Sequence, residues 1–179
     1  MFRSAVTGLV AFCVLLSLPM AAKAQPNPVA MENVLARGLD VAFSPDGARF
    51  VTVQDDFALV LWSTDTGAEL ARIEGHSDVV NDVEFSRDGT RLVSASADGT
   101  ARVWAVNNGE ELLILDGHKG AVHSAQFSTS GGIIVTASDD GAVKLGLSAN
   151  GELLHALDAQ GDGVPDAAFS PDGTLLVTN

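Results

Sequence analysis

The chain has 179 residues, of which 46% are hydrophobic and 18 are glycine, and its formal net charge at pH 7 is −13. This acidic balance argues against binding of nucleic acid or of an anionic membrane surface, because both depend on clustered Lys and Arg. The hydrophobic content and the many glycines are typical of a packed fold with many turns, and not of a disordered chain.

The first 24 residues have the pattern of a secretory signal peptide. Arg3 precedes the apolar run VTGLVAFCVLLSLPMA, and the small-residue pattern Ala22-Lys23-Ala24 follows, which predicts cleavage before Gln25. The run is shorter than the roughly 20 residues that a membrane span needs, although an uncleaved anchor is the alternative. We therefore expect an exported protein, periplasmic or secreted, without membrane insertion after cleavage.

Cleavage would also change the composition of the chain. It would remove Cys13, the only cysteine, so that no thiol, disulfide or thiolate metal ligand is expected in the mature protein. It would leave 155 residues, which suits one modest domain, and would change the formal charge from −13 to −15 because Arg3 and Lys23 are lost. The next segment, residues 25–37, offers one outer strand at most.

A repeat of 42 residues organises the rest of the sequence. The segment Phe43-Ser44-Pro45-Asp46-Gly47 returns, with changes, at residues 85–89, 127–131 and 169–173. Gly75-His76 recurs at residues 117–118 with the same spacing. Unrelated markers that share one period, without insertions, indicate structural repeats. Units are predicted to start near residues 38, 80, 122 and 164, and the last unit is incomplete because the sequence stops before its Asp-Gly turn.

Each unit predicts four antiparallel strands in chain order. The first strand ends in the phenylalanine of the repeat, and its apolar residues alternate with others at the period of a strand. A tight turn follows, because Asp caps the turn and Gly tolerates positive φ. A second strand (RFVTV, RLVSAS, GIIVTAS) reaches the Asp-Gly turn, a third (ALVLW, ARVW, AVKLG) leaves it and a fourth (ELARI, ELLIL, ELLHAL) precedes the next unit. Four short strands per unit are typical of a propeller blade.

The combination of Gly-His, Phe-Ser-x-Asp-Gly and Ser-Ala-Asp-Gly-Thr-Ala-Arg-Val-Trp resembles the WD40-repeat family over about residues 33–179. The resemblance implies an all-β fold, a partial WD40-type β-propeller of about three and a half four-stranded antiparallel blades in residues 38–179. It also implies one hydrogen-bond network per blade, which joins a His, a Ser or Thr, an Asp and a Trp.

In the second unit this network would contain His76, Asp98 and Trp104, with either Ser94 or Ser96 as the hydroxyl. We favour Ser94, because only its position in the repeat holds a hydroxyl in every unit. A buried carboxylate needs donors around it, and the imidazole could bridge Asp98 to Ser94 while the hydroxyl accepts the indole N–H. Such a network rigidifies a blade when every group is satisfied.

The other units are predicted to hold incomplete versions of this network. The first unit has Val34 in place of the His but keeps Thr52, Asp56 and Trp62. The third unit has Gly146 in place of the Trp but keeps His118, Thr136 and Asp140.

Two chemical alternatives arise from these residue types. His76, Asp98 and Ser94 could form a hydrolase triad, but the set recurs partly in neighbouring units and no G-x-S-x-G motif is present. Asp158, Asp162 and Asp166 are weak candidates for a calcium loop, yet position 12 of that loop is Phe169, where an EF-hand loop needs Glu. We therefore expect neither an enzyme nor a metal site or cofactor.

The leading functional interpretation is an exported, non-catalytic scaffold that binds a protein partner on the rims of its blades. The alternative is an accessory or sensor segment of a larger exported enzyme or electron-transfer protein, whose active residues would lie beyond Asn179. The incomplete last unit favours a fragment or truncated product of a longer propeller. Alternatively, two copies could complete a ring of seven blades by self-association through their open blade edges.

Overall fold

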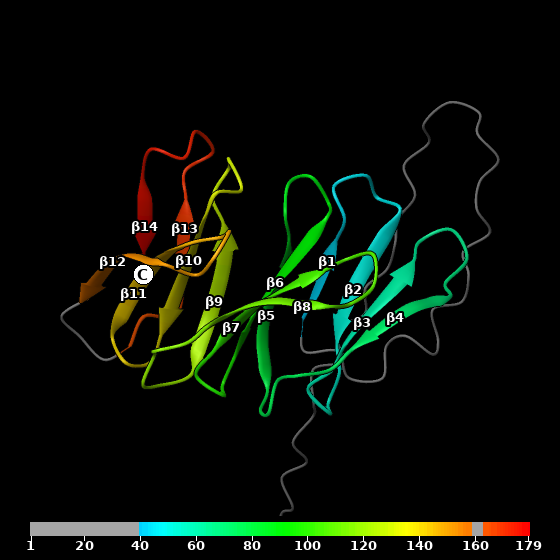
Figure 1. Ribbon diagram of the computed structural model, residues 1–179, viewed down its shortest axis with the longest axis horizontal. Helices are drawn as coiled ribbons and strands as arrows, with labels where there is room; N and C mark the ends of the chain where they lie inside the picture. Colours follow the sequence, from blue (N-terminus) through cyan, green and yellow to red (C-terminus); the bar gives the residue numbers. More distant parts are fainter. Residues whose placement is uncertain (1–39, 159–162) are drawn as a thin grey trace, which may run out of the picture.

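The computed structural model describes residues 40–158 and 163–179, which fold entirely as β-structure (Figure 1). Three four-stranded antiparallel sheets and one two-stranded sheet follow one another in chain order. The first sheet contains β1 (Val41–Phe43), β2 (Arg49–Val53), β3 (Leu59–Ser63) and β4 (Glu69–Ile73); the second contains β5 (Val80–Phe85), β6 (Arg91–Ser96), β7 (Ala101–Ala105) and β8 (Glu111–Leu115). The third contains β9 (Val122–Phe127), β10 (Ile133–Ser138), β11 (Ala142–Leu147) and β12 (Leu153–Asp158), and the last contains β13 (Ala167–Phe169) and β14 (Leu176–Thr178).

These sheets are the predicted blades, so the expectation of an all-β fold with three and a half blades is confirmed. The described residues contain no helix that is long and apolar enough to cross a membrane. The predicted signal peptide, the segment 25–37 and residues 159–162 lie outside the described residues.

The strand register repeats from blade to blade. In each blade the chain runs from one strand to its neighbour, so that every hydrogen-bonded pair is a hairpin. Leu92 on β6 pairs with Trp104 on β7, and Ile134 on β10 pairs with Gly146 on β11. Residues 42 positions apart therefore occupy equivalent places in neighbouring blades, which permits a direct comparison of their surroundings.

In the first two blades, two side chains and a glycine of the repeat build the turn between the first and second strands. In the second blade Ser86 Oγ donates to Asp88 Oδ1 at 2.7 Å and accepts from the backbone N–H of Arg91 at 2.9 Å. Gly89 has φ of +69°, a conformation that residues with a Cβ rarely adopt. The first blade repeats this arrangement with Ser44, Asp46 and Gly47, which explains the Phe-Ser-x-Asp-Gly segment.

The hydrophobic core lies between the blades. Each of three buried clusters joins one face of a blade to the facing side of the next, and the first cluster packs Val51, Leu61 and Ile73 against Phe85 and Trp104. The second and third clusters repeat this pairing one and two units further along the chain. A blade therefore buries its apolar residues only when it has neighbours, as stacked repeats do.

Hydrogen bonds also link neighbouring blades, and the sequence patterns did not predict them. Side-chain oxygens on the first strand of a blade, or one residue before it, accept backbone N–H groups 43 residues further along, on the next blade. The pairs are Asp40 with Val83 (3.0 Å), Asp82 with Ala125 (2.9 Å), Glu84 with Phe127 (3.0 Å) and Ser124 with Ala167 (3.3 Å). The available signal was the polar residue at one position of the 42-residue repeat, which is Asp40, Asp82, Ser124 and Asp166 in successive units.

Candidate functional site

The structure brings the four predicted network residues of the second blade together. His76 Nδ1 lies 2.8 Å from Asp98 Oδ2, and His76 Nε2 lies 2.8 Å from Ser94 Oγ. Trp104 Nε1 donates to the same Ser94 Oγ at 2.8 Å. Ser96 lies outside this chain of bonds: its hydroxyl donates to the carbonyl of Asp78 and accepts from the N–H of Asp98.

The hydrogen bonds of this network determine its protonation state. Burial alone would raise the pKa of Asp98, but the hydrogen bonds from Thr100, His76 and Ser77 outweigh burial and lower the pKa to about 2. Burial lowers the pKa of His76 below its ordinary value, more than the neighbouring Asp98 raises it. A neutral imidazole that donates from Nδ1 to the carboxylate must accept at Nε2, so the Ser94 hydroxyl donates to His76. The lone pairs of Ser94 Oγ then accept the indole N–H.

The first blade uses its residues differently. Trp62 Nε1 donates to Thr52 Oγ1 at 2.9 Å, as Trp104 does to Ser94. The amide of Gln54 donates to the same Thr52 oxygen at 2.7 Å, a role that the sequence interpretation missed. Asp56 is not part of this cluster, because its carboxylate pairs with Arg72. Val34, which replaces the His in the sequence, lies outside the described residues.

The third blade contains the His, Thr and Asp members without the Trp. His118 Nδ1 lies 3.1 Å from Asp140 Oδ2, and His118 Nε2 lies 2.8 Å from Thr136 Oγ1. Burial alone would raise the pKa of Asp140, but backbone hydrogen bonds from Lys119 and Ala142, together with His118, lower it to about 2. The geometry of the His–Asp pair is thus repeated, and a glycine stands where the indole would donate.

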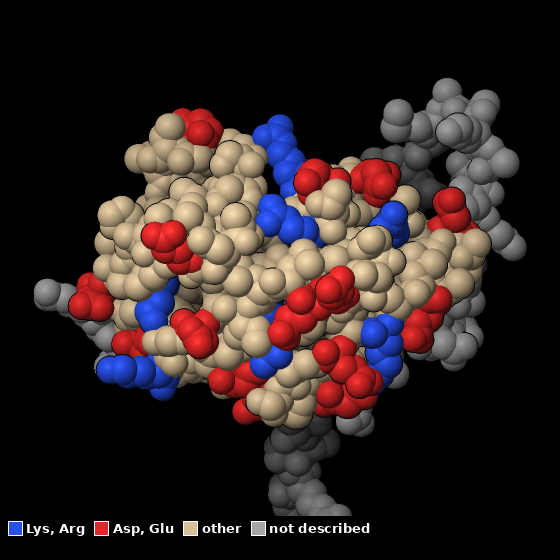
Figure 2. All heavy atoms as spheres, viewed as in Figure 1, with Lys and Arg blue, Asp and Glu red and all other residues tan. Residues whose placement is uncertain are grey.

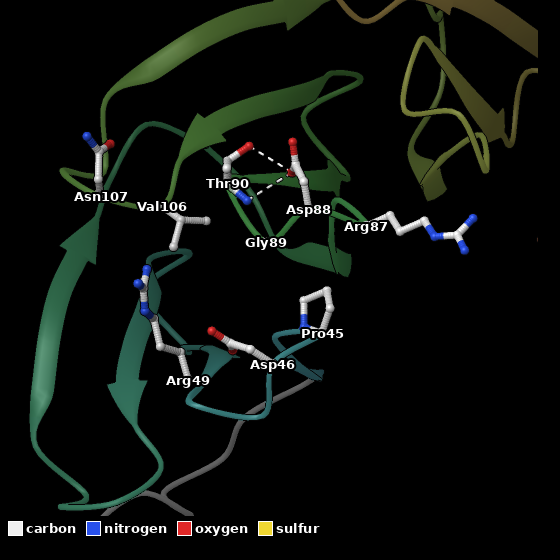
Figure 3. Close-up of a pocket in the computed structure, with 9 residues that line it drawn as sticks. All are labelled: Pro45, Asp46, Arg49, Arg87, Asp88, Gly89, Thr90, Val106 and Asn107. Carbon is white, nitrogen blue, oxygen red and sulfur yellow. Dashed lines mark hydrogen bonds between the residues drawn. The ribbon is translucent and has the colours of Figure 1, made fainter.

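A groove of about 650 Å³ lies on the rim between the first two blades (Figure 3). The turns at Asp46 and Asp88 form its two sides, and Arg49 lies between Asp46 and Val106. In the second blade the equivalent Arg91 reaches into the third blade. Its guanidinium donates to the carbonyls of Gly131 and Ser148 and lies 5.1 Å from the centre of the Phe127 ring.

The described residues include only two of the three weak acidic candidates. The described residues contain no group of three or more His, Cys, Asp or Glu side chains that could hold a metal ion. Asp158 ends the exposed strand β12, and Asp166 is exposed just before β13. Asp162 lies outside the described residues.

The comparisons with known proteins agree with the repeat. Residues 67–105 and 109–145 each match the family model described as WD40: WD domain, G-beta repeat. No curated protein matches the chain. The first matched segment includes Trp104, and the second ends at Leu145, one residue before Gly146.

Proposed function

Because the chain belongs to the WD40-repeat family, we propose that it is an exported, non-catalytic scaffold that binds a protein partner on the rims of its blades. One observation carries the non-catalytic part of the proposal. The set of residues that resembles a hydrolase triad is enclosed within the second blade, where Ser94 is 0% exposed and its oxygen already contacts His76 and Trp104. A nucleophile must reach its substrate, and this hydroxyl is used inside the fold.

Charge and sequence support the remaining parts of the proposal. On the face drawn in Figure 2, Lys and Arg are dispersed among Asp and Glu, so that face offers no continuous basic area to nucleic acid. The N-terminal pattern of residues 1–24 supports export. The rim that carries the groove is the proposed binding surface, because the exposed Arg87 and the half-buried Arg49 lie beside it. Arginine is among the residues enriched at protein interfaces.

A charge reversal on this rim is expected to weaken partner binding. The partner would be captured with the wild-type chain, identified, purified and titrated against Arg87→Glu by calorimetry. Arg87 is exposed and lines the groove, so we expect a loss of roughly tenfold or more in affinity without a change in thermal stability.

Lys119→Glu is the matched control, because Lys119 is also exposed but lies on the opposite rim. It follows the Gly-His segment and precedes strand β9, whereas the turn equivalent to that of Arg87 follows β9. It is expected to bind the partner as the wild type does. Equal binding by wild type and Arg87→Glu would remove the rim from the proposal, and turnover of a substrate by the purified chain would contradict the scaffold function.

We also propose that copies of the chain associate head to tail through their two end faces. Phe43 is 49% exposed, whereas the equivalent Phe85 is 6% exposed against the first blade. Val177 is 64% exposed, whereas the equivalent Val135 is 0% exposed against β13. Among the described residues, the faces that carry Phe43 and Val177 are therefore the two sides of the interface that recurs between blades. A contact between these two faces in different copies is heterologous and builds a ring or an open chain.

In light scattering, the wild-type chain is expected to have a mass above that of one copy, and this mass should increase with protein concentration. Phe43→Asp and Val177→Asp are each expected to give the mass of one copy, and an equimolar mixture of the two to give a pair. Leu112→Asp is the matched control, since Leu112 is also 49% exposed but lies on β8, away from both end faces. A wild-type chain with the mass of one copy at every concentration would refute head-to-tail association.

A further inference from the structure

The third blade contains a hollow of about 250 Å³ in the place of a missing tryptophan. Gly146, Gly117, Thr136 and His118 line it, together with the side chain of Lys144. Apolar atoms of Leu115 and the exposed Ile114 and Leu153 complete the walls. Asp116 also lines the hollow, which thus combines apolar walls with several polar groups.

The equivalent positions of the second blade enclose the indole ring of Trp104. A Cβ placed on Gly75, which is equivalent to Gly117, would lie 2.8 Å from the Trp104 ring and 3.1 Å from Arg102, which is equivalent to Lys144. His76 contacts the same ring edge-on, with 5.9 Å between ring centres. The hollow in the third blade therefore has the surroundings of an indole ring without the ring.

Among these polar groups, the Thr136 hydroxyl is an acceptor with a spare lone pair. His118 Nδ1 faces the carboxylate of Asp140, so the Thr136 hydroxyl donates its proton to His118 Nε2, as Ser94 does to His76. In the first and second blades the corresponding oxygen also accepts an indole N–H, at 2.9 and 2.8 Å. In the third blade, residue 146 is a glycine and supplies no such donor.

We propose that this hollow binds an indole ring, which donates its N–H to Thr136 Oγ1 and packs where Trp104 packs in the second blade. An apolar cavity of about 150 Å³ is large enough to hold benzene, so 250 Å³ accommodates the larger bicyclic ring. The ammonium group of Lys144, which donates to the carbonyl of Gly117, lies beside the ring site and favours an electron-rich aromatic face.

Calorimetric titration with indole and with benzofuran tests the proposal. Benzofuran has the same shape but carries an oxygen in place of the N–H, so the wild type should bind indole about tenfold more tightly. Thr136→Val should remove this preference. Thr136→Ser is the matched control and should keep it, because Ser94 provides the same hydroxyl in the second blade.

Gly146→Trp provides a second test, in which the chain fills its own hollow. This variant should lose indole binding and unfold at a higher temperature than the wild type. The reason is that residue 146 has the same position in the strand register of the third blade as Trp104 has in the second. No detectable binding of indole by the wild type, equal affinities for indole and benzofuran, or indole binding that survives Gly146→Trp would each overturn the proposal.

N-acetyltryptophanamide distinguishes the source of the ring. If it binds as indole does, the ring belongs to a tryptophan side chain of a polypeptide; if only indole binds, the ring belongs to a small aromatic molecule. Arg87→Glu is expected to bind indole normally, because the rim groove and the hollow share no lining residue. Failure of indole binding is thus distinguishable from failure of the rim to bind a protein.

Discussion

Replacement of Trp104 by Ala is expected to lower the free energy of unfolding by roughly 3–5 kcal/mol, as large aromatic truncations in protein cores do. The Trp104 side chain is 1% exposed and belongs to the buried cluster between the first and second blades. Its removal would leave a cavity and would deprive Ser94 Oγ of the indole N–H that it accepts at 2.8 Å. Urea denaturation, followed by circular dichroism, measures the change.

Trp62→Ala is the matched control for this substitution. Trp62 makes the equivalent hydrogen bond to Thr52, but its side chain is only half-buried on the outer face of the first blade. We expect a clearly smaller loss of stability, because less apolar area returns to water. A melting temperature that Trp104→Ala leaves unchanged would refute a stabilising role of the network.

Replacement of Glu84 by Gln is expected to stabilise the chain by about 2 kcal/mol near pH 8 and to have no effect near pH 4. Burial is the main cause that raises the pKa of Glu84 to about 7; the hydrogen bond from the Phe127 N–H opposes it, and the nearby Asp82 carboxylate adds to it. The ionised form is therefore disfavoured in the folded chain, at about 1.4 kcal/mol per pKa unit. Solvent reaches part of the Glu84 side chain and weakens this penalty, which leaves about 2 kcal/mol.

The direction of the pH effect follows from the raised pKa. The contribution of Glu84 to stability is fully present below its unfolded pKa of about 4.5 and is lost as the pH rises through about 7. Glutamine keeps an oxygen that accepts the Phe127 N–H, now bonded at 3.0 Å, and it does not titrate. Urea denaturation of both chains at several pH values gives the difference between them.

Asp88→Asn serves as a control with the opposite sign. Hydrogen bonds from Ser86 and Thr90 lower the pKa of Asp88 to about 2, so its stabilising effect is present above its unfolded pKa and is lost as the pH falls towards 2. This variant should therefore be less stable than the wild type near pH 8. If Glu84→Gln had the stability of the wild type at every pH, ionisation of Glu84 between the second and third blades would not destabilise the fold, and the prediction would be wrong.

Most of the local structure could be predicted from the sequence, because the physical causes are local. Alternating apolar residues identify strands, and the Ser-x-Asp-Gly segment forms its turn from residues within five positions of one another. Because the sequence repeats, the strands and turns predicted for one unit also apply to the next. The preference for Ser94 over Ser96 also came from the repeat, and the structure places Ser94, not Ser96, against His76.

The interactions between units were beyond the sequence patterns. Glu84 looks like an ordinary polar residue of a strand until the next blade places Phe127 N–H against its carboxylate. Asp56 shares its place in the repeat with Asp98, yet it pairs with Arg72. A side chain on a strand can be assigned to one face from the sequence, but its partner depends on which element packs there.

The sequence by itself determined the repeating blade, its turns and the set of residues that form one network per unit, since each depends on the order of residues within about 42 positions. Only the tertiary structure decided what Gly146 does. In the sequence it is a missing tryptophan; in the fold it leaves a hollow, which Leu115, Lys144 and Gly117 line from different segments of the chain. Whether a deleted side chain is replaced by neighbours or leaves a site depends on packing between elements, which the order of residues does not specify.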